Sequence, residues 1–274
     1  MSICRPAFWL PSYSQGFARS AAEAAYPNLR NGPRFCWHGP LGPTGSRAFD
    51  VSGRANHGTL INMDPAADWV ITAKGCWGLD FHAASNQHVY SDAGIPDYPF
   101  TLAAWFDSTD AGTEIVFSIG DSSGAFYTGL HAAGETAIGV LRYQGTVRTN
   151  TYAVTAGVHL LVAVCTARDH ADVYIDGVLV ATLTTDTGAA TTWDRTAIGV
   201  SADSTPYGYS RSKVISAASY DRALLPSEIQ LLYADEHALT RLADRRVVAT
   251  TGGAPPAGTP WLYARLGSRV IGAA

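Results

Sequence analysis

The stretch from Ala171 to Thr184, ADVYIDGVLVATLT, constrains the fold more than any other part of the chain. Two alternating runs rich in β-branched residues flank the pair Asp176-Gly177. An Asp-Gly pair supplies the positive φ angles that a type I′ turn requires, and this turn joins two antiparallel strands. The stretch therefore predicts an antiparallel hairpin.

Further short strands are expected along the rest of the chain. In the run from Phe100 to Asp107, alternate residues place Phe100, Leu102, Ala104 and Phe106 on one face of a strand. Glu114–Gly120 and Ala125–His131 flank a turn, as the two strands of a hairpin would. His159–Thr166 is apolar nearly throughout, which is typical of a strand covered on both faces.

From about Phe35 to Tyr233 the chain is thus a succession of short strands separated by turn residues, which favours a sandwich or barrel. Parallel α/β architecture is disfavoured because the intervening helices are missing. Only five of the 23 acidic residues are Glu, which also argues against long helices. We therefore predict an all-β fold, an antiparallel β-sandwich with short helical additions.

Two short helices are expected. One lies around Phe17–Ala25 and is ended by Pro27. The other begins after Leu225, where Pro226 suits the first helical position and Glu228 the first turn. Its apolar face is formed by Ile229, Leu232 and Tyr233.

The charge of the chain excludes several partners. With 19 basic and 23 acidic residues the formal net charge is −4, so no basic surface for nucleic acid or anionic lipid is expected. No apolar run approaches the ~20 residues that a membrane helix needs. The N-terminal residues lack the sustained apolar stretch of a usual signal peptide.

Three regions are expected: an N-terminal arm over residues 1–33, a sandwich domain over 34–243, and a C-terminal linker and docking tail over 244–274. The linker contains the Gly/Pro/Ala run TTGGAPPAGTP. Two arms on a compact domain suggest a partner or a larger assembly, with homo-oligomerisation as one form of it; the alternative is that both arms pack on their own sandwich. Whether Cys36 and Cys76 form a disulfide is left open.

Several strings resemble the laminin-G-like, concanavalin A-like jelly-roll domains. In RAFDVSGRANHGTLINM, the residues that match the family pattern D-x-S-G-x-x-N-H-G are Asp50, Ser52, Gly53, Asn56, His57 and Gly58. The strings GCWGLDFHAASNQHVYSD, PFTLAAWFDST, ADVYIDGVLVATL and SYDRALLPSEIQLLYAD resemble later strands and the closing helix, in the family's order. The resemblance covers about two hundred residues and implies a jelly-roll sandwich. Leu225 stands where relatives usually have Ser or Thr as the helix cap, so that cap is weaker here.

The string AAYPNLRNGPRFCWHGPLGPTGSRAFDVSGRANHGTL resembles, more narrowly, jelly-roll proteins encoded in tailed-bacteriophage genomes. This resemblance implies a place on the virion, as a capsid decoration, a head fibre or part of a tail adhesin, with assembly in the host cytoplasm. Other virion proteins would then be partners through the terminal arms.

Catalysis is not expected. Glycoside hydrolases that resemble this fold carry paired carboxylates, typically E-x-D-x-x-E, and no two Glu have that spacing; Glu114 is nearest in context. Gly120–Gly124 matches G-x-S-x-G around Ser122, but a strand follows instead of the helix that a nucleophile elbow needs, so a polar hairpin turn is favoured. The eight His form no zinc-binding pair.

Two kinds of ligand site are candidates. Asp50, Asn56 and Asp80 lie in or beside turns and could supply oxygen ligands to calcium, whereas the alternative is that Asp50 and Asn56 brace their own turn. The segment SADSTPYGYSRSK could bind a glycan through aromatic faces and planar polar groups; the alternative is an ordinary turn. Its candidate glycan ligands are Tyr207, Tyr209, Arg211 and Asp203.

The leading hypothesis is a non-enzymatic virion surface protein that displays a lectin-like domain toward host surface glycans. A second hypothesis is a purely structural cement in a capsid or tail interface that binds no sugar. A third is a carbohydrate-active enzyme of unusual mechanism.

Overall fold

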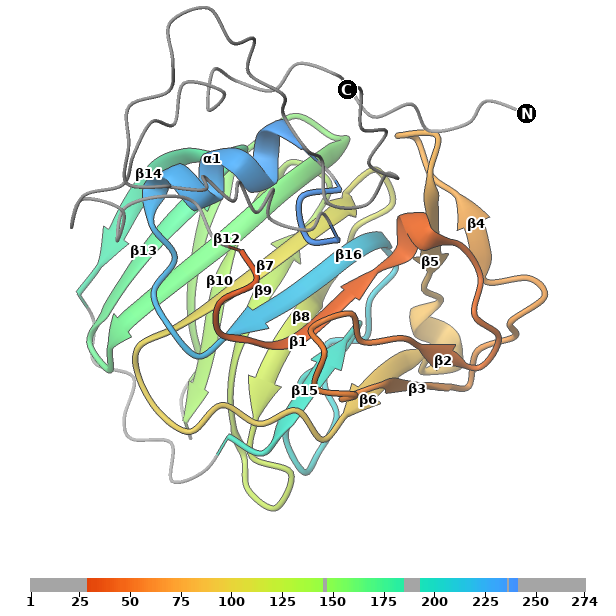
Figure 1. The fold of residues 1–274 in the computed structure, drawn as a ribbon, viewed down its shortest axis with the longest axis horizontal. Helices are drawn as coiled ribbons and strands as arrows, with labels where there is room; N and C mark the ends of the chain where they lie inside the picture. Colours follow the sequence, from red (N-terminus) through yellow and green to blue (C-terminus); the bar gives the residue numbers. More distant parts are fainter. Residues whose placement is uncertain (1–28, 145–146, 185–192, 236, 241–274) are drawn as a thin grey trace, which may run out of the picture. The chain divides into compact units, whose positions relative to one another are not determined.

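The computed structural model describes residues 29–144, 147–184, 193–235 and 237–240. These residues form two antiparallel β-sheets that pack face to face (Figure 1). The predicted all-β antiparallel sandwich is therefore confirmed.

Sheet A has eight strands. Seven of them follow one another across the sheet in the order β14 (Val178–Leu183), β13 (His170–Ile175), β12 (Val158–Ala167), β7 (Phe100–Asp107), β16 (Lys213–Tyr220), β5 (Trp77–Asp80) and β4 (Trp69–Ile71). The eighth strand, β1 (Pro33–His38), pairs with β16.

Sheet B also has eight strands. Their order across the sheet is β11 (Val147–Ala153), β10 (Ala137–Gln144), β9 (Phe126–Ala133), β8 (Thr113–Gly120), β15 (Arg195–Ile198), β6 (His88–Ser91), β3 (Gly58–Ile61) and β2 (Arg47–Ala48). The short helices in the described part of the chain are η3 (Gly39–Leu41), η4 (Ala83–Ser85) and α1 (Pro226–Ala234).

The predicted alternation in β7 is confirmed. Its four residues Phe100, Leu102, Ala104 and Phe106 all belong to the main core, between the sheets. Trp105 lies on the opposite face, where a second core forms against α1. Strand β12 is covered on both faces, as expected, since Leu161 belongs to the main core and Leu160 to the second one.

Both predicted hairpins are present. Strands β13 and β14 are antiparallel, and the turn residues Asp176 and Gly177 have φ angles of 50° and 81°. These positive values are the reason that this turn needs Asp-Gly. Strands β8 and β9 form the second hairpin.

Helix α1 covers the outer face of sheet A. Ile229 and Leu232 are buried in the second core, and the indole N–H of Trp105 donates a hydrogen bond to the carbonyl of Leu232 at 3.2 Å. Leu225 supplies no side-chain cap, as expected; instead its own N–H donates to the Glu228 carboxylate at 2.8 Å. Tyr233 was expected on the apolar face but is 43% exposed, with its ring stacked on that of Trp105.

Cys36 and Cys76 are both buried and are not joined to each other by a disulfide. The expected helix at Phe17–Ala25, residues 1–28 of the N-terminal arm and the tail at 244–274 lie outside the described residues, and the three-region division stays a prediction. Within the described ranges, no helix is long and apolar enough to cross a membrane.

Candidate functional site

Sheet B has a core face and an outer face. The residues of its central strands that point into the core are Ile119, Leu130 and Ile198. The residues beside them point outward, because side chains alternate along a strand. At the centre of the outer face, Gly129 pairs with Ser118, which pairs with Ala197, so all three outward positions carry small residues.

Because these residues are small, a loop can lie directly against the sheet at this place. Residues Gly199–Ser210 form a compact loop, here called the Ω-loop, whose ends meet where the N–H of Ser210 donates to the carbonyl of Gly199 at 2.8 Å. The Ser118 hydroxyl donates to the loop carbonyl of Val200 at 2.8 Å. A Cβ atom at Gly120 would lie 2.8 Å from the loop backbone. The sheet therefore needs small residues to let the Ω-loop lie against it.

Tyrosines surround the Ω-loop. The rings of Tyr127 on β9 and Tyr143 on β10 stack with centroids 5.7 Å apart. On the other side, the guanidinium of Arg195 lies 4.5 Å from the centroid of the Tyr90 ring. Tyr207, in the Ω-loop, is 55% exposed. The outer face thus offers aromatic surface on both sides of a loop and on the loop itself.

The phenols of Tyr90 and Tyr127 stay protonated at neutral pH because their pKa values are raised. Burial raises the pKa of Tyr90 to about 12. Burial also raises the pKa of Tyr127, and the nearby Asp203, Tyr207 and Tyr143 contribute to the same shift, which places these four residues in one neighbourhood. A protonated phenol can both donate and accept a hydrogen bond.

The four glycan candidates occupy different environments. Tyr207 and Arg211 are exposed and Tyr209 is half-buried. Asp203 is buried, and it accepts a hydrogen bond from the Ser201 hydroxyl at 2.8 Å. Burial raises the pKa of Asp203. Asp203 therefore shapes the Ω-loop from within, while Tyr207 and Arg211 are exposed on the surface.

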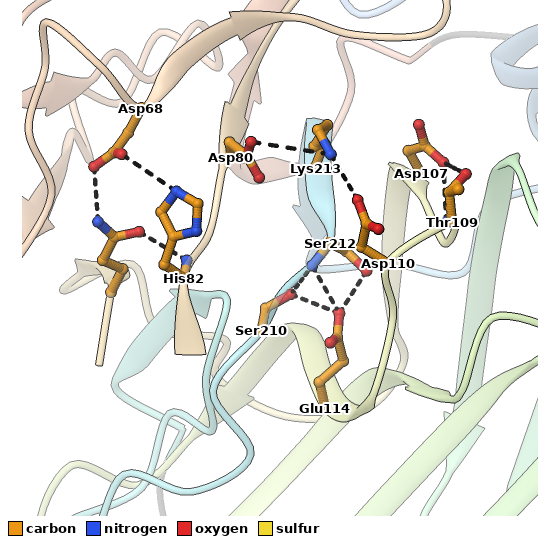
Figure 2. A network of polar contacts seen from close by, with 11 residues as sticks. Asp68, Asp80, His82, Asp107, Thr109, Asp110, Glu114, Ser210, Ser212 and Lys213 are labelled. Carbon is orange, nitrogen blue, oxygen red and sulfur yellow. Dashed lines mark hydrogen bonds and ion pairs between the residues drawn. The ribbon is translucent and has the colours of Figure 1, made fainter. Parts of the chain in front are cut away.

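A buried carboxylate fixes the end of the Ω-loop. Glu114, only 2% exposed, accepts hydrogen bonds from the Ser210 hydroxyl at 2.8 Å and from the backbone N–H of Ser212 at 3.0 Å (Figure 2). The backbone N–H of Arg211 also donates to it, at 2.9 Å. The N–H of Gly112 donates to it at 3.0 Å. Glu114 is a positioning group for the loop, not an exposed acid.

Beside Glu114, Lys213 links two carboxylates. Its ammonium lies 3.0 Å from Asp110 and 3.9 Å from Asp80 (Figure 2). Burial raises the pKa of Asp80, and the charge of Lys213 opposes that shift. Asp80, a calcium candidate, is thus in contact with a cation of the protein itself.

The other calcium candidates brace a turn. The Asp50 carboxylate accepts from the N–H groups of Cys36, Ser52 and Asn56, each at 2.9 Å, and from the Ser52 hydroxyl at 2.6 Å. The Asn56 amide donates to the carbonyl of Arg34 at 2.7 Å. Among the described residues no group of three or more His, Cys, Asp or Glu is arranged to hold a metal ion. A calcium site at Asp50, Asn56 and Asp80 stays a prediction.

Ser122 lies in the turn between β8 and β9, as the hairpin interpretation expected. Its hydroxyl donates to Asp194 at 2.7 Å and its N–H donates to the same carboxylate at 2.8 Å. The pair ties this turn to the residue just before β15.

Sequence reasoning missed the tyrosines of the strands. Tyr127 and Tyr143 lie at positions of AFYTGLH and VLRYQ that alternate with core residues such as Leu130 and Val140. That alternation could have placed both on the outer face, but the pairing of β9 with β10, which brings them together, is a long-range feature.

A comparison with known protein families shows which family has this fold. Residues 83–230, more than half of the chain, match the model of the Laminin_G_3 family, described as the concanavalin A-like lectin/glucanases superfamily. The chain belongs to this family. The jelly-roll resemblance is thereby confirmed, whereas a bacteriophage origin is not. No curated protein matches the chain.

Solved structures share the laminin-G-like fold at low identity. A mutant of Trypanosoma rangeli sialidase that displays trans-sialidase activity matches with a TM-score of 0.55 and 20% identity, over 74% of this chain and 33% of that one. The binding domain of botulinum neurotoxin DC, in complex with rat synaptotagmin II, matches with a TM-score of 0.56 and 6% identity, over 75% of this chain and 52% of that one. This chain thus covers a third of the sialidase and half of the toxin domain.

The expectation that the chain is not an enzyme was wrong. Sialidases are among the structures that share the fold, so the fold itself gives no ground for excluding catalysis. The missing E-x-D-x-x-E pattern excludes only one route to hydrolysis.

Proposed function

We propose that this laminin-G-like domain is lectin-like and binds a glycan on the outer face of sheet B. The observation that carries the proposal is Tyr207, which is 55% exposed on a loop fixed at its end by the buried Glu114. Lectins belong to the superfamily that the family description names, which supports the same conclusion.

The chemistry of the face suits a sugar. The apolar C–H face of a sugar ring packs on an aromatic side chain, while the hydroxyl groups need nearby donors and acceptors. The rings of Tyr143, Tyr207 and Tyr209 offer the aromatic surface, and the Arg211 guanidinium is an exposed planar donor. The Ω-loop is already closed by a backbone hydrogen bond between its ends, so it gives up little conformational entropy when a ligand binds.

Glycan-array screening of the full chain, followed by titration of the best ligand, tests the proposal. We expect Tyr207→Ala to weaken binding at least tenfold, which corresponds to about 1.4 kcal/mol. The matched control is Tyr233→Ala, because Tyr233 is similarly exposed, at 43%, but lies on α1 over sheet A. Equal loss in both variants, or wild-type protein that binds no glycan, would contradict the proposal.

We propose further that the domain is displayed on a virus particle, with the arms over 1–33 and 244–274 attaching it to other virion proteins. Support comes from the resemblance of AAYPNLRNGPRFCWHGPLGPTGSRAFDVSGRANHGTL to phage-encoded jelly-roll proteins. The chain should co-purify with particles through a density gradient, and deletion of Met1–Leu29 and Ala254–Ala274 should abolish that association but leave glycan binding intact. Association with particles without any glycan binding would instead indicate a structural cement.

A further inference from the structure

The main strand orders of the two sheets end in four terminal strands, and three of these have features that hinder pairing with another chain. Strand β1 lies off these orders and pairs with β16. In sheet B, β2 is two residues long and β11 has the polar sequence VRTNTYA. In sheet A, β4 is three residues long. Short or polar edge strands hinder pairing with another chain.

The fourth edge strand, β14, has the opposite character. Its sequence, VLVATL, contains no charged residue and no proline. Val178, Leu179 and Val180 are 62%, 49% and 40% exposed. Among the described residues its one strand partner is β13, so no described strand pairs with its other side.

Strand β14 is already ordered within a single copy of the chain. The turn from β13 to β14 is fixed by Asp176 and Gly177, and the side-chain amide of Gln230 on α1 donates to the carbonyl of Gly177. A rigid strand loses little entropy when it pairs, so the edge suits strand addition.

We propose that two copies of this chain pair through β14 in antiparallel fashion and form a two-fold symmetric dimer. A second copy fits because an uncharged strand does not repel itself and because an antiparallel pair of identical strands satisfies both edges at once. With the axis through the pair formed by Ala181 of each copy, Leu179 of one copy lies opposite Leu183 of the other, on the same face of the joined sheet. Sheet A then continues across both copies.

The dimer has a functional consequence that rests on the proposed glycan face. The two-fold axis of an antiparallel pair within one sheet is perpendicular to the sheet. Sheet B of each copy therefore lies on the same side of the joined sheet A, and both outer faces with Tyr207 point in the same direction. Two faces so oriented can bind one glycan-covered surface together, which strengthens attachment through effective concentration.

Light scattering on the full chain, over a range of concentrations, tests the dimer directly. We expect the wild-type mass to approach twice 29.0 kDa, and Leu179→Lys to shift it to 29.0 kDa, because a lysine on an edge strand opposes pairing. Ile71→Lys is the matched control, since Ile71 is 57% exposed on the other edge of sheet A. Circular dichroism verifies that each variant is folded, and Val178→Lys serves if Leu179→Lys is not.

Hydrogen exchange supplies a second readout. In the wild type the amides of Val178–Leu183 should become more protected as the concentration rises, and in Leu179→Lys they should not. A wild type that stays monomeric, or a variant whose mass equals that of the wild type, overturns the dimer. If the dimer forms, Leu179→Lys should bind a glycan-coated surface at least tenfold more weakly while its affinity for the free sugar is unchanged. Loss of sugar binding in both assays would instead count against the glycan face.

Discussion

The imidazole of His159 lies between two acceptors, and one of them is the carboxylate of Asp176. Nδ1 of His159 is 2.8 Å from Asp176 Oδ2, and Nε2 is 2.7 Å from the carbonyl oxygen of Thr155. The other carboxylate oxygen accepts from the N–H of Leu160 at 2.9 Å. Both ring nitrogens must donate, so His159 is held in its charged form and joins β12 to the turn between β13 and β14.

This ion pair predicts a stability that depends on pH. The hydrogen bond to Asp176 raises the pKa of His159 above its ordinary value of 6.5. A raised pKa means that the folded state holds a proton that the unfolded state releases, so the contribution is full below pH 6.5 and is lost as pH rises through the folded value. We expect Asp176→Asn, which tolerates the positive φ of this turn, to remove that contribution.

Urea unfolding at pH 6 and at pH 9 measures the effect. The free energy of unfolding of Asp176→Asn should lie below that of the wild type at pH 6, and the gap should narrow at pH 9. Asp169→Asn is the control, because it removes an exposed carboxylate from the neighbouring turn. A gap that is the same at both pH values would show that the pair does not titrate as described.

The buried Glu114 gives a prediction for the Ω-loop. In Glu114→Gln one carboxylate oxygen becomes an NH₂ group, which faces N–H donors such as those of Arg211 and Gly112. Leaving such buried donors unsatisfied should cost about 2–4 kcal/mol of unfolding free energy. Glu135→Gln, at an exposed position, should change it by less than about 0.5 kcal/mol. Denaturant titration compares the two, and an equally small loss in both would contradict the positioning role.

Local sequence patterns predicted the strands well, because residues only a few positions apart determine where each strand of this sandwich forms. The alternation around Trp105 and the Asp176-Gly177 pair each specify an element within a few residues. The candidate site was harder. Tyr207 was found because it lies in a loop rich in turn residues, whereas Tyr127 and Tyr143 meet only through the register of β9 and β10. Register and loop packing depend on contacts far apart in the chain.

The roles of polar residues were equally hard to predict from the sequence. Asp203 was a reasonable ligand candidate because it sits among tyrosines in the sequence, yet it is buried and bonded within its own loop. Glu114 was considered as a catalytic carboxylate. Its carboxylate oxygens instead accept hydrogen bonds from a segment almost one hundred residues away in the sequence, around Ser210 and Ser212. Sequence spacing identifies a carboxylate without showing which donors surround it.

His131 predicts sensitivity to acid. It is 1% exposed on β9, and burial lowers its pKa below 6.5. The unfolded chain therefore takes up a proton as pH falls through 6.5 while the folded chain does not, and stability falls. One such group contributes at most about 1.4 kcal/mol per pH unit. In His131→Leu this contribution should vanish.

Unfolding free energies at pH 7.5 and pH 5 give the comparison for His131. The unfolding free energy of His131→Leu minus that of the wild type should be more positive at pH 5 than at pH 7.5, whatever its sign at pH 7.5. Glu135→Leu, at an exposed site on the adjacent turn, should not show this relative gain. A relative stability of His131→Leu that is independent of pH would show that His131 is as easily protonated in the folded state as in the unfolded one.

Asp50 predicts a structural cost that does not depend on calcium. Its two oxygens already accept four hydrogen bonds, from Cys36, Asn56 and twice from Ser52. In Asp50→Ala these donors lose their acceptor, and we expect a loss of about 2–4 kcal/mol. The loss should be equal in EDTA and in millimolar calcium, because the lone pairs that a cation would need already face the protein's own donors. Asp92→Ala, at an exposed position, is the control. A melting temperature that rises with calcium in the wild type but not in Asp50→Ala would establish Asp50 as a calcium ligand instead of a brace.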